Sequence, residues 1–189
     1  GPIDDEGLAE YYAVDFASRT NEFAQSSALE LIPEGASAQA AQTLYIVDNA
    51  HGVGAKDGLA DAADGSAYSA AHKDVHRTFR SALQAFGAYD IFLIDDATGT
   101  IVYSVFKEID YGTSLANGPH ADSGLAEAWR LSLASNTQST VDFAPYVPSY
   151  DAPAAFSAQG VFDERGNRLG TIAMQAPVDR INAVMTSNE

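Results

Sequence analysis

Residues Tyr89 to Leu115 form the stretch that most restricts how this chain of 189 residues can fold. Two runs rich in β-branched and aromatic residues, Ile91 to Ile94 and Thr100 to Phe106, flank the short segment Asp95 to Gly99. Acidic, small and glycine residues in so short a segment favour a tight reversal of the chain. The stretch therefore predicts a β-hairpin, which we expect to be the central pair of a sheet.

Before the hairpin, the spacing of apolar residues predicts helices rather than strands. We expect one long amphipathic helix from Asp4 to about Ile32 and a second from a Ser37 cap through Val47. A third is expected from a Ser66 cap to Gly87. The glycine-rich loop 48–65 separates the second helix from the third, and a loop of this length in a compact domain tends to be functional or mobile.

After the hairpin, the pattern predicts one helix, three strands and a closing helix. The helix covers 124–134, and the strands cover 140–143, 154–162 and 169–175, with a proline-stiffened loop at 144–153. Pro177 suits the first position of the closing helix. Five strands, interrupted once by a helix and preceded by helices, predict an α+β fold with an antiparallel sheet backed by helices.

We expect one folded unit with two parts, a mainly helical part over residues 3–87 and a sheet part over residues 88–189. Gly1 and Pro2 resemble the scar that remains when a fusion tag is removed. If so, the remaining residues are a soluble piece of a longer protein, whose targeting and membrane segments lie outside the sequence.

The composition excludes several classes of protein. With 26 acidic against 10 basic residues, the formal net charge is −16, so the surface repels polyanions and we expect no nucleic-acid partner. The absence of cysteine excludes disulfides, thiolate metal sites and a cysteine nucleophile. No apolar run approaches the roughly 20 residues that span a bilayer.

Motifs for catalysis or metal binding are weak. There is no Gly-x-Ser-x-Gly elbow, and Gly52 and Gly54 are too few for a phosphate-binding loop, so we expect neither an enzyme nor a cofactor. His72 and His76 have a spacing that can chelate a metal, but no third ligand is evident, which favours a packed or pocket-lining pair over a metal site. In the glycine-rich loop, His51 and Lys56 are expected to be exposed bystanders.

Five segments of the chain resemble the Cache family of PAS-like extracytoplasmic sensor domains. They are FGAYDIFLID at 86–95, IVYSVFKE at 101–108, GPHADSGLA at 118–126, DFAPY at 142–146 and APVDRINAVM at 176–185. The resemblance covers roughly residues 39–185 and is closest to the versions found on methyl-accepting chemotaxis proteins, nucleotide cyclases and histidine kinases. The tyrosine, arginine and tryptophan signature of the amino-acid-binding branch is not found before the pocket strands.

The resemblance implies a PAS-like five-stranded sheet with a ligand cavity on one face. It also implies a long N-terminal helix that rises from a transmembrane segment. A C-terminal helix would lead toward the membrane or toward a second sensor module.

The hairpin and the loops that follow it supply the candidate ligand-binding residues. Period-two alternation puts Tyr103 and Lys107 on one side of the second hairpin strand if that strand stays regular. Lys107 can hold a carboxylate through a charge-assisted hydrogen bond, whereas the alternative is a surface ion pair with Glu108 or Asp110. The complete candidate set, which includes hydroxyl groups, ring walls and one histidine, is Tyr103, Lys107, Tyr111, Tyr146, Tyr150 and His72.

These patterns lead us to expect the periplasmic ligand-sensing domain of a bacterial inner-membrane receptor that serves chemotaxis. Its ligand would be a small molecule that bears a carboxylate, and its terminal helices would carry the signal. The parent protein would be anchored in the membrane, and a homodimer is compatible with this arrangement. The alternative is a ligand-free interaction or dimerisation module of a sensor kinase or nucleotide cyclase, which binds a periplasmic protein.

Overall fold

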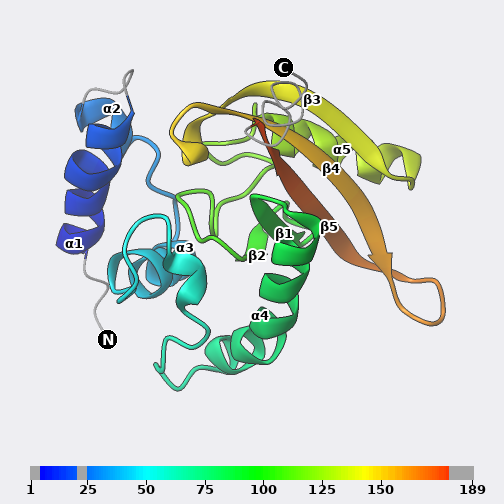
Figure 1. The fold of residues 1–189 in the computed structure, drawn as a ribbon, viewed down its shortest axis with the longest axis horizontal. Coiled ribbons are helices and arrows are strands. Elements are labelled where there is room, and N and C mark those ends of the chain that lie inside the picture. The colour runs from blue at the N-terminus through cyan, green and yellow to red at the C-terminus, as the bar shows by residue number, and fades with distance from the viewer. Residues whose placement is uncertain (1–4, 21–24, 179–189) are drawn as a thin grey trace, which may run out of the picture.

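The computed structural model describes residues 5–20 and 25–178, and its centre is a five-stranded antiparallel sheet (Figure 1). The strands are β1 (Asp90–Ile94), β2 (Ile101–Ser104), β3 (Ser139–Tyr146), β4 (Ala152–Phe162) and β5 (Arg168–Pro177). They pair in the order β2-β1-β5-β4-β3. The expected α+β class with a PAS-like five-stranded antiparallel sheet is therefore confirmed.

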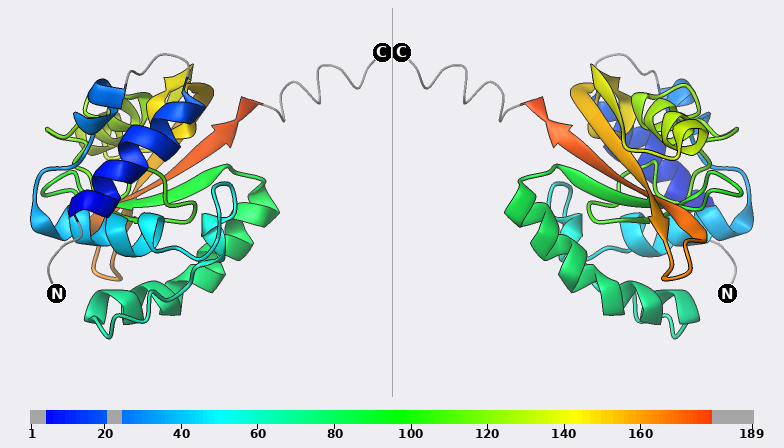
Figure 2. Two further views of the ribbon diagram at one scale, coloured as in Figure 1. Left: turned by 90° about the vertical axis from the view of Figure 1, so that its left-hand side faces the viewer. Right: turned by 90° about the vertical axis from the view of Figure 1, so that its right-hand side faces the viewer.

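Two longer helices cover opposite faces of this sheet (Figure 2). Helix α5 (Gly124–Ser135) packs on β3, β4 and β5, where Leu125 and Trp129 meet Phe156 in one apolar cluster. Helix α4 (Ala67–Phe86) lies on the other face, where Leu83 packs with Ile91 of β1. Alternation along β1 explains the division, because successive side chains of a strand point to opposite faces.

The N-terminal region is helical but is not one long helix. Helix α1 (Asp5–Glu10) continues through a π-helical turn, Tyr11–Phe16, and a 3₁₀ turn, Ala17–Arg19, and then stops at Thr20, which is extended at φ −105° and ψ 138°. The Thr20 hydroxyl donates to the carbonyl oxygen of Ala17, and such side-chain bonds to the backbone compete with helix continuation. A separate helix, α2 (Gln25–Leu29), packs back against the π-helical turn.

The second predicted helix is present, although it begins two residues early and without the expected Ser37 cap. Helix α3 (Ala36–Gln42) has Gly35 as its N-cap, with no side-chain cap bond. It continues as a π-helical turn, Thr43–Val47. The loop that follows contains a 3₁₀ turn at Lys56–Gly58.

Both predicted ends of α4 are confirmed. The Ser66 hydroxyl accepts the backbone N–H of Ser69, and Gly87 ends the helix in the left-handed region at φ 61°. The buried face of α4 is not purely apolar, because His72 and His76 are buried while Val75 and Phe86 are exposed. The N-terminal half of α4 packs both on the loop 48–65 and on β2. His72 and His76 bond to carbonyl oxygens of the loop, and Tyr68 and His76 also bond to residues of β2.

The predicted hairpin is confirmed, with β1 and β2 antiparallel and Gly99 left-handed at φ 70°. Its place in the sheet and its length differ from the prediction. Strand β2 lies at the edge, β5 holds the centre, and β2 ends at Ser104 instead of Phe106.

The early end of β2 has a clear cause in the carboxylate of Asp90, which is 1% exposed. Its Oδ1 accepts the backbone N–H groups of Val105 and Phe106 at 2.9 and 3.1 Å, and its Oδ2 accepts the hydroxyl of Ser104 at 2.6 Å. The N–H of Val105 also bonds to the carbonyl oxygen of Ile91 at 3.2 Å, so the last bond between β1 and this segment is shared with Asp90. The N–H of Phe106 is directed to Asp90, and the backbone turns inward after Ser104.

The elements after the hairpin follow the predicted order. Ser123 caps α5 through a bond from the N–H of Ala126. Strand β3 extends through Tyr146, so the predicted proline loop shrinks to residues 147–151, with a 3₁₀ turn at Val147–Ser149. Pro145 is tolerated because β3 is an edge strand.

The predicted closing helix cannot be compared with the structure over most of its length. Pro177 is the last residue of β5, so it is not the first residue of a helix as expected. The rest of that prediction, after Val178, lies outside the described residues.

Gln42 connects the N-terminal helix to the segment that follows β2, and we predict that this connection stabilises the fold. Its Nε2 donates to the carbonyl oxygens of Ile109 and Tyr111 at 2.7 and 2.9 Å, and its Oε1 accepts the hydroxyl of Tyr12 at 2.8 Å. Gln42→Leu keeps the volume but leaves the carbonyl oxygen of Tyr111 without this donor, and it leaves the hydroxyl of Tyr12 and the carbonyl oxygen of Ile109 with only their mutual bond of 3.4 Å. The free energy of unfolding in urea should fall by about 2–5 kcal/mol.

Gln39→Leu is the matched control on the same helix, because the Gln39 side chain is part-buried and donates only one bond, to the carbonyl oxygen of Pro33. Its effect should stay below about 1 kcal/mol. Equal losses for the two variants would contradict the special role of Gln42.

Candidate functional site

Charged and polar side chains are buried where β2 ends, between α4, the loop 48–65, the N-terminal helix and the segment 105–113. We call this group the buried polar cluster, and it consists of Lys56, His72, His76, Asp90, Tyr103, Lys107, Glu108 and Asp110. Every member is at most 4% exposed. Burial of ionisable groups is costly, so their concentration at one place marks a candidate functional site.

Lys107 lies at the centre of the cluster and is 0% exposed. Its backbone is left-handed at φ 60°, and its N–H donates to the Ser104 hydroxyl at 2.8 Å. Its Nζ donates to the carbonyl oxygens of Val105 at 2.9 Å and Lys56 at 3.4 Å. Burial lowers the pKa of Lys107 to about 7.

The structure corrects two expectations about Lys107. Its side chain is buried, so it forms no surface ion pair with Glu108 or Asp110. It also lies three residues beyond the end of β2, so strand alternation does not place it beside Tyr103. The turn that Asp90 imposes brings the two residues into the same region.

Lys56 is a second buried lysine, so the expectation that it is an exposed bystander is wrong. It is 1% exposed, and its Nζ donates to the Tyr11 hydroxyl at 3.1 Å. Burial lowers the pKa of Lys56, and the nearby Glu108 carboxylate partly opposes this shift. No periodicity distinguishes a buried lysine in a glycine-rich loop, whereas His51 in the same loop is exposed as expected.

The carboxylates of the cluster are held by hydroxyl and backbone groups. Glu108 accepts the hydroxyls of Tyr89 and Ser149 at 3.0 and 3.1 Å, and Asp110 accepts the Tyr146 hydroxyl at 2.6 Å. Burial raises the pKa of Glu108 to about 8, of Asp90 to about 7 and of Asp110 to about 6. Oδ1 of Asp110 is a buried acceptor without a partner among the described residues.

His72 and His76 form a stacked pair on α4, with ring centroids 4.8 Å apart. His72 Nδ1 lies 2.7 Å from the carbonyl oxygen of Ala60, and His76 Nε2 lies 2.8 Å from that of Asp57. A carbonyl oxygen only accepts, so each of these nitrogens carries the hydrogen. His76 Nδ1 then accepts the Tyr103 hydroxyl at 2.8 Å.

This assignment leaves His72 Nε2 as an acceptor, buried and without a partner among the described residues. Burial lowers the pKa of His72 to about 4 and also lowers that of His76, so both rings are neutral near pH 7. His76 was not selected from the sequence, although its spacing from His72 was noted.

Tyrosine rings close the cluster on the side of α3. Tyr45 packs against His72 with ring centroids 4.6 Å apart and against Tyr111 at 5.6 Å. The hydroxyls of Tyr68 and Tyr111 form a hydrogen bond. The polar groups are therefore enclosed by the protein's own side chains.

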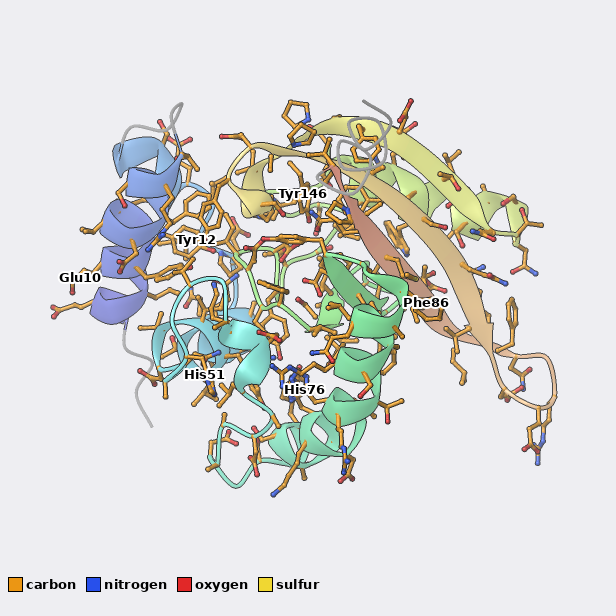
Figure 3. All side chains as sticks on the ribbon, in the orientation of Figure 1. Glu10, Tyr12, His51, His76, Phe86 and Tyr146 are labelled. Carbon is orange, nitrogen blue, oxygen red and sulfur yellow. The ribbon has the colours of Figure 1, made fainter. Side chains whose placement is uncertain are left out.

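The six predicted ligand-binding residues do not all lie equally close to the buried polar cluster. His72, Tyr103, Lys107 and Tyr111 belong to the cluster or its wall. Tyr146 joins through its bond to Asp110, opposite His76 across the region (Figure 3). Tyr150 is only partly buried, and its ring packs on Phe16 at 5.6 Å, so it lies farther out. Their roles in binding stay predictions.

The described ranges contain neither a metal-binding cluster of side chains nor a membrane-spanning helix. No group of three or more His, Asp or Glu side chains in residues 5–20 and 25–178 is placed to hold a metal ion. No helix within those ranges is long and apolar enough to cross a membrane.

Comparison with known proteins gives similarities of fold. No protein-family model and no curated protein matches the sequence. Among solved structures, the sensor domain of the V. cholerae histidine kinase DctB has 23% identity and a TM-score of 0.46, over 61% of this chain and 42% of that one. The E. coli DcuS sensor domain has 11% identity and a TM-score of 0.41, over 66% and 84%.

The ligand-binding domain of the amino-acid chemoreceptor PctC from Pseudomonas aeruginosa PAO1, in complex with GABA, has 14% identity and a TM-score of 0.42. That alignment covers 60% of this chain and 50% of that one. The aligned region therefore spans half or less of the DctB and PctC domains.

The raised pKa values of the three buried carboxyl groups predict an unusual pH dependence of stability. Each group binds its proton more tightly in the folded protein than in the unfolded chain, so its contribution is present at low pH and is lost as the pH rises toward about 6 to 8. The buried histidines His72, His76 and His120 act in the opposite sense below their ordinary pKa, near 6.5, and Lys107 does so from about pH 6 upward. The carboxyl contribution is therefore measured as a difference: the free energy of unfolding of the wild type minus that of Asp90→Asn should fall between about pH 5 and pH 7.

Urea titrations of the wild type and of Asp90→Asn at several pH values measure this difference. Asp95→Asn, in the hairpin turn, is the control, and its difference from the wild type should not change with pH. A wild-type minus Asp90→Asn difference that stays constant or rises over this range would contradict the assignment.

Proposed function

We propose that this chain is the ligand-sensing domain of a bacterial transmembrane receptor, of the Cache type, and that it binds a small molecule bearing a carboxylate. The observation that carries the proposal is Lys107. Its ammonium group is fully buried, yet among the described residues no carboxylate lies within ion-pair distance of it. A buried cation with only carbonyl partners is costly, and an anionic ligand would remove that cost.

The surroundings of Lys107 suit a ligand with more than one polar group. Lys107 and Lys56 can donate to a carboxylate, while Nε2 of His72 and Oδ1 of Asp110 are buried acceptors that need donors. Tyrosine rings supply the apolar walls. A few convergent polar groups within apolar walls are the usual composition of a small-molecule site. We infer a small carboxylate that also carries a hydroxyl or an amine.

The N-terminal helix provides a route for the signal. Lys56 bonds to the hydroxyl of Tyr11, and Gln42 bonds to that of Tyr12, so two residues of this helix depend on groups at or beside the cluster. A ligand that reorients Lys56 would alter the stability of these contacts. It can shift the helix only to the extent that it binds the two positions unequally.

We further propose that the domain is periplasmic, that its parent protein is anchored in the inner membrane, and that its output serves chemotaxis. These points follow from the Cache resemblance of the five quoted segments, two of which adjoin the cluster at 86–95 and 101–108. Displacement of a terminal helix is the kind of output that a membrane receptor can transmit.

Lys107→Met tests the proposed site. A thermal-shift screen of small carboxylates against the wild type should find at least one that raises Tm by about 5–10 °C at 100 times its Kd. Lys107→Met should abolish this shift. Without ligand, the variant should be as stable as the wild type or more stable, because an apolar side chain replaces an unpaired buried charge.

Lys73→Met is the matched control, since Lys73 is an exposed lysine of α4 that pairs with Asp61. It should retain the full ligand-induced shift. A stabilising carboxylate whose effect survives Lys107→Met would place the ligand elsewhere, and no hit among the carboxylates would overturn the ligand class.

One observation favours the alternative, a ligand-free interaction module. The cluster is closed by its own rings, while Phe86 and Leu169 are 64% and 65% exposed beside shallow apolar hollows on the α4 face of the sheet.

If this face mediates dimerisation, a stable dimer should be measured by sedimentation. Phe86→Asp together with Leu169→Asp should convert the dimer to a monomer, and a wild-type monomer at all concentrations would reject this alternative.

A further inference from the structure

A groove runs between α3 and the outer edge of β2, on the far side of the tyrosine wall from the buried polar cluster. Its volume is about 400 Å³. Small and apolar side chains such as Ala38, Ala41, Leu44 and Val102 line most of it. Its inner end is formed by Tyr45, Tyr68 and Tyr111, the same residues that close the cluster on that side.

Tyr68 differs from the other side chains of this wall. Its side chain is 40% exposed, whereas Tyr45, Tyr111 and His72 are at most 2% exposed. The Tyr68 hydroxyl is held by two bonds, one to the carbonyl oxygen of Val102 at 2.8 Å and one shared with the hydroxyl of Tyr111. Its ring packs edge-on against Tyr45 with centroids 5.8 Å apart.

The backbone before Tyr68 favours movement of this residue rather than of its neighbours. Tyr68 is the second residue of α4, within the first turn, where helices fray most readily. The preceding loop contains Ala63 and Gly65, both left-handed, at φ 56° and 75°. By contrast, Tyr45 and Tyr111 are 0% and 1% exposed.

Directly behind Tyr68 lies His72, one helical turn along α4, with ring centroids 6.2 Å apart. Nε2 of His72 is the buried acceptor that lacks a partner. Thus the Tyr68 ring, partly exposed and held by two hydrogen bonds, lines the apolar groove and neighbours the ring that carries the buried polar atom without a partner.

We infer that the groove is the entrance to the buried polar cluster and that Tyr68 is the side chain that opens it. This inference rests on the proposed function and adds to it the shape of the ligand. A molecule that enters here has a polar head that reaches His72 and Lys107 and a slim apolar body that stays in the groove. Short-chain or aryl-substituted carboxylates with a hydroxyl or an amine near the carboxylate fit this description.

Diethyl pyrocarbonate, which acylates neutral imidazole nitrogens, tests the entrance without any knowledge of the ligand. The chain has four histidines, and their separate rates of modification can be followed by peptide mass spectrometry. His51 is exposed and serves as the reference for reagent activity, while His120 is 4% exposed and reports on general loosening of the fold.

Tyr68→Ala should accelerate modification of His72 about tenfold relative to the wild type and leave the rates of His51 and His120 unchanged. Tyr68→Phe, which keeps the ring and removes both hydroxyl bonds, should give a smaller acceleration. The control is Val75→Ala, at an exposed position of α4 outside the groove, and it should leave His72 protected.

Ser37→Trp supplies the complementary change, since Ser37 is an exposed residue that lines the groove. In the Tyr68→Ala background it should slow the modification of His72 again. An unchanged His72 rate in Tyr68→Ala, equal acceleration of His72 and His120, or no effect of Ser37→Trp would each overturn the inference. Because the reagent reports access alone, the entrance and the carboxylate specificity can fail independently.

Discussion

The structure depends on the buried carboxylate of Asp90. Two backbone N–H groups and one hydroxyl from the far end of the hairpin converge on it, which ends β2 and turns the chain into the interior. Without that turn, residues 105–108 would continue along the sheet edge, where side chains alternate between the two faces. The turn brings Lys107, Glu108 and Asp110 into the interior, where bonds from Tyr89, Ser149, Tyr146 and Gln42 hold the segment and its carboxylates.

As a consequence, the interior of the protein contains two kinds of packing, one apolar and one polar. On the α5 side, apolar residues such as Phe92 and Phe156 pack in the ordinary way. At the end of β2, charged side chains are held by hydroxyls and carbonyl oxygens rather than by one another. A core built only for stability would replace them with apolar residues at little cost. The presence of these charged side chains therefore points to a role other than stability.

Much of this fold could be predicted from the sequence, but the site could be predicted only in part. Strand order along the chain, the hairpin turn and the caps of α4 and α5 depend on local periodicity and on single cap residues, which the sequence displays directly. The edge position of β2 and the early break of the N-terminal helix depend on which distant donors a side chain reaches. Lys56 and His76 were missed because burial of a polar residue leaves no periodic signal; only the loop that covers α4 makes them interior.

The left-handed backbone of Lys107 has a consequence for how such sequences diverge. A residue other than glycine at φ 60° stores of order 1 kcal/mol of strain, and its buried ammonium adds a desolvation cost. Glycine would relieve both. In a lineage that no longer needs a cation at this position, substitution of the lysine by glycine or asparagine is energetically favourable. Persistence of lysine among relatives would instead record selection for its charge. The identity of one residue thus becomes a marker that separates descendants that still use this cluster from descendants that keep only the fold.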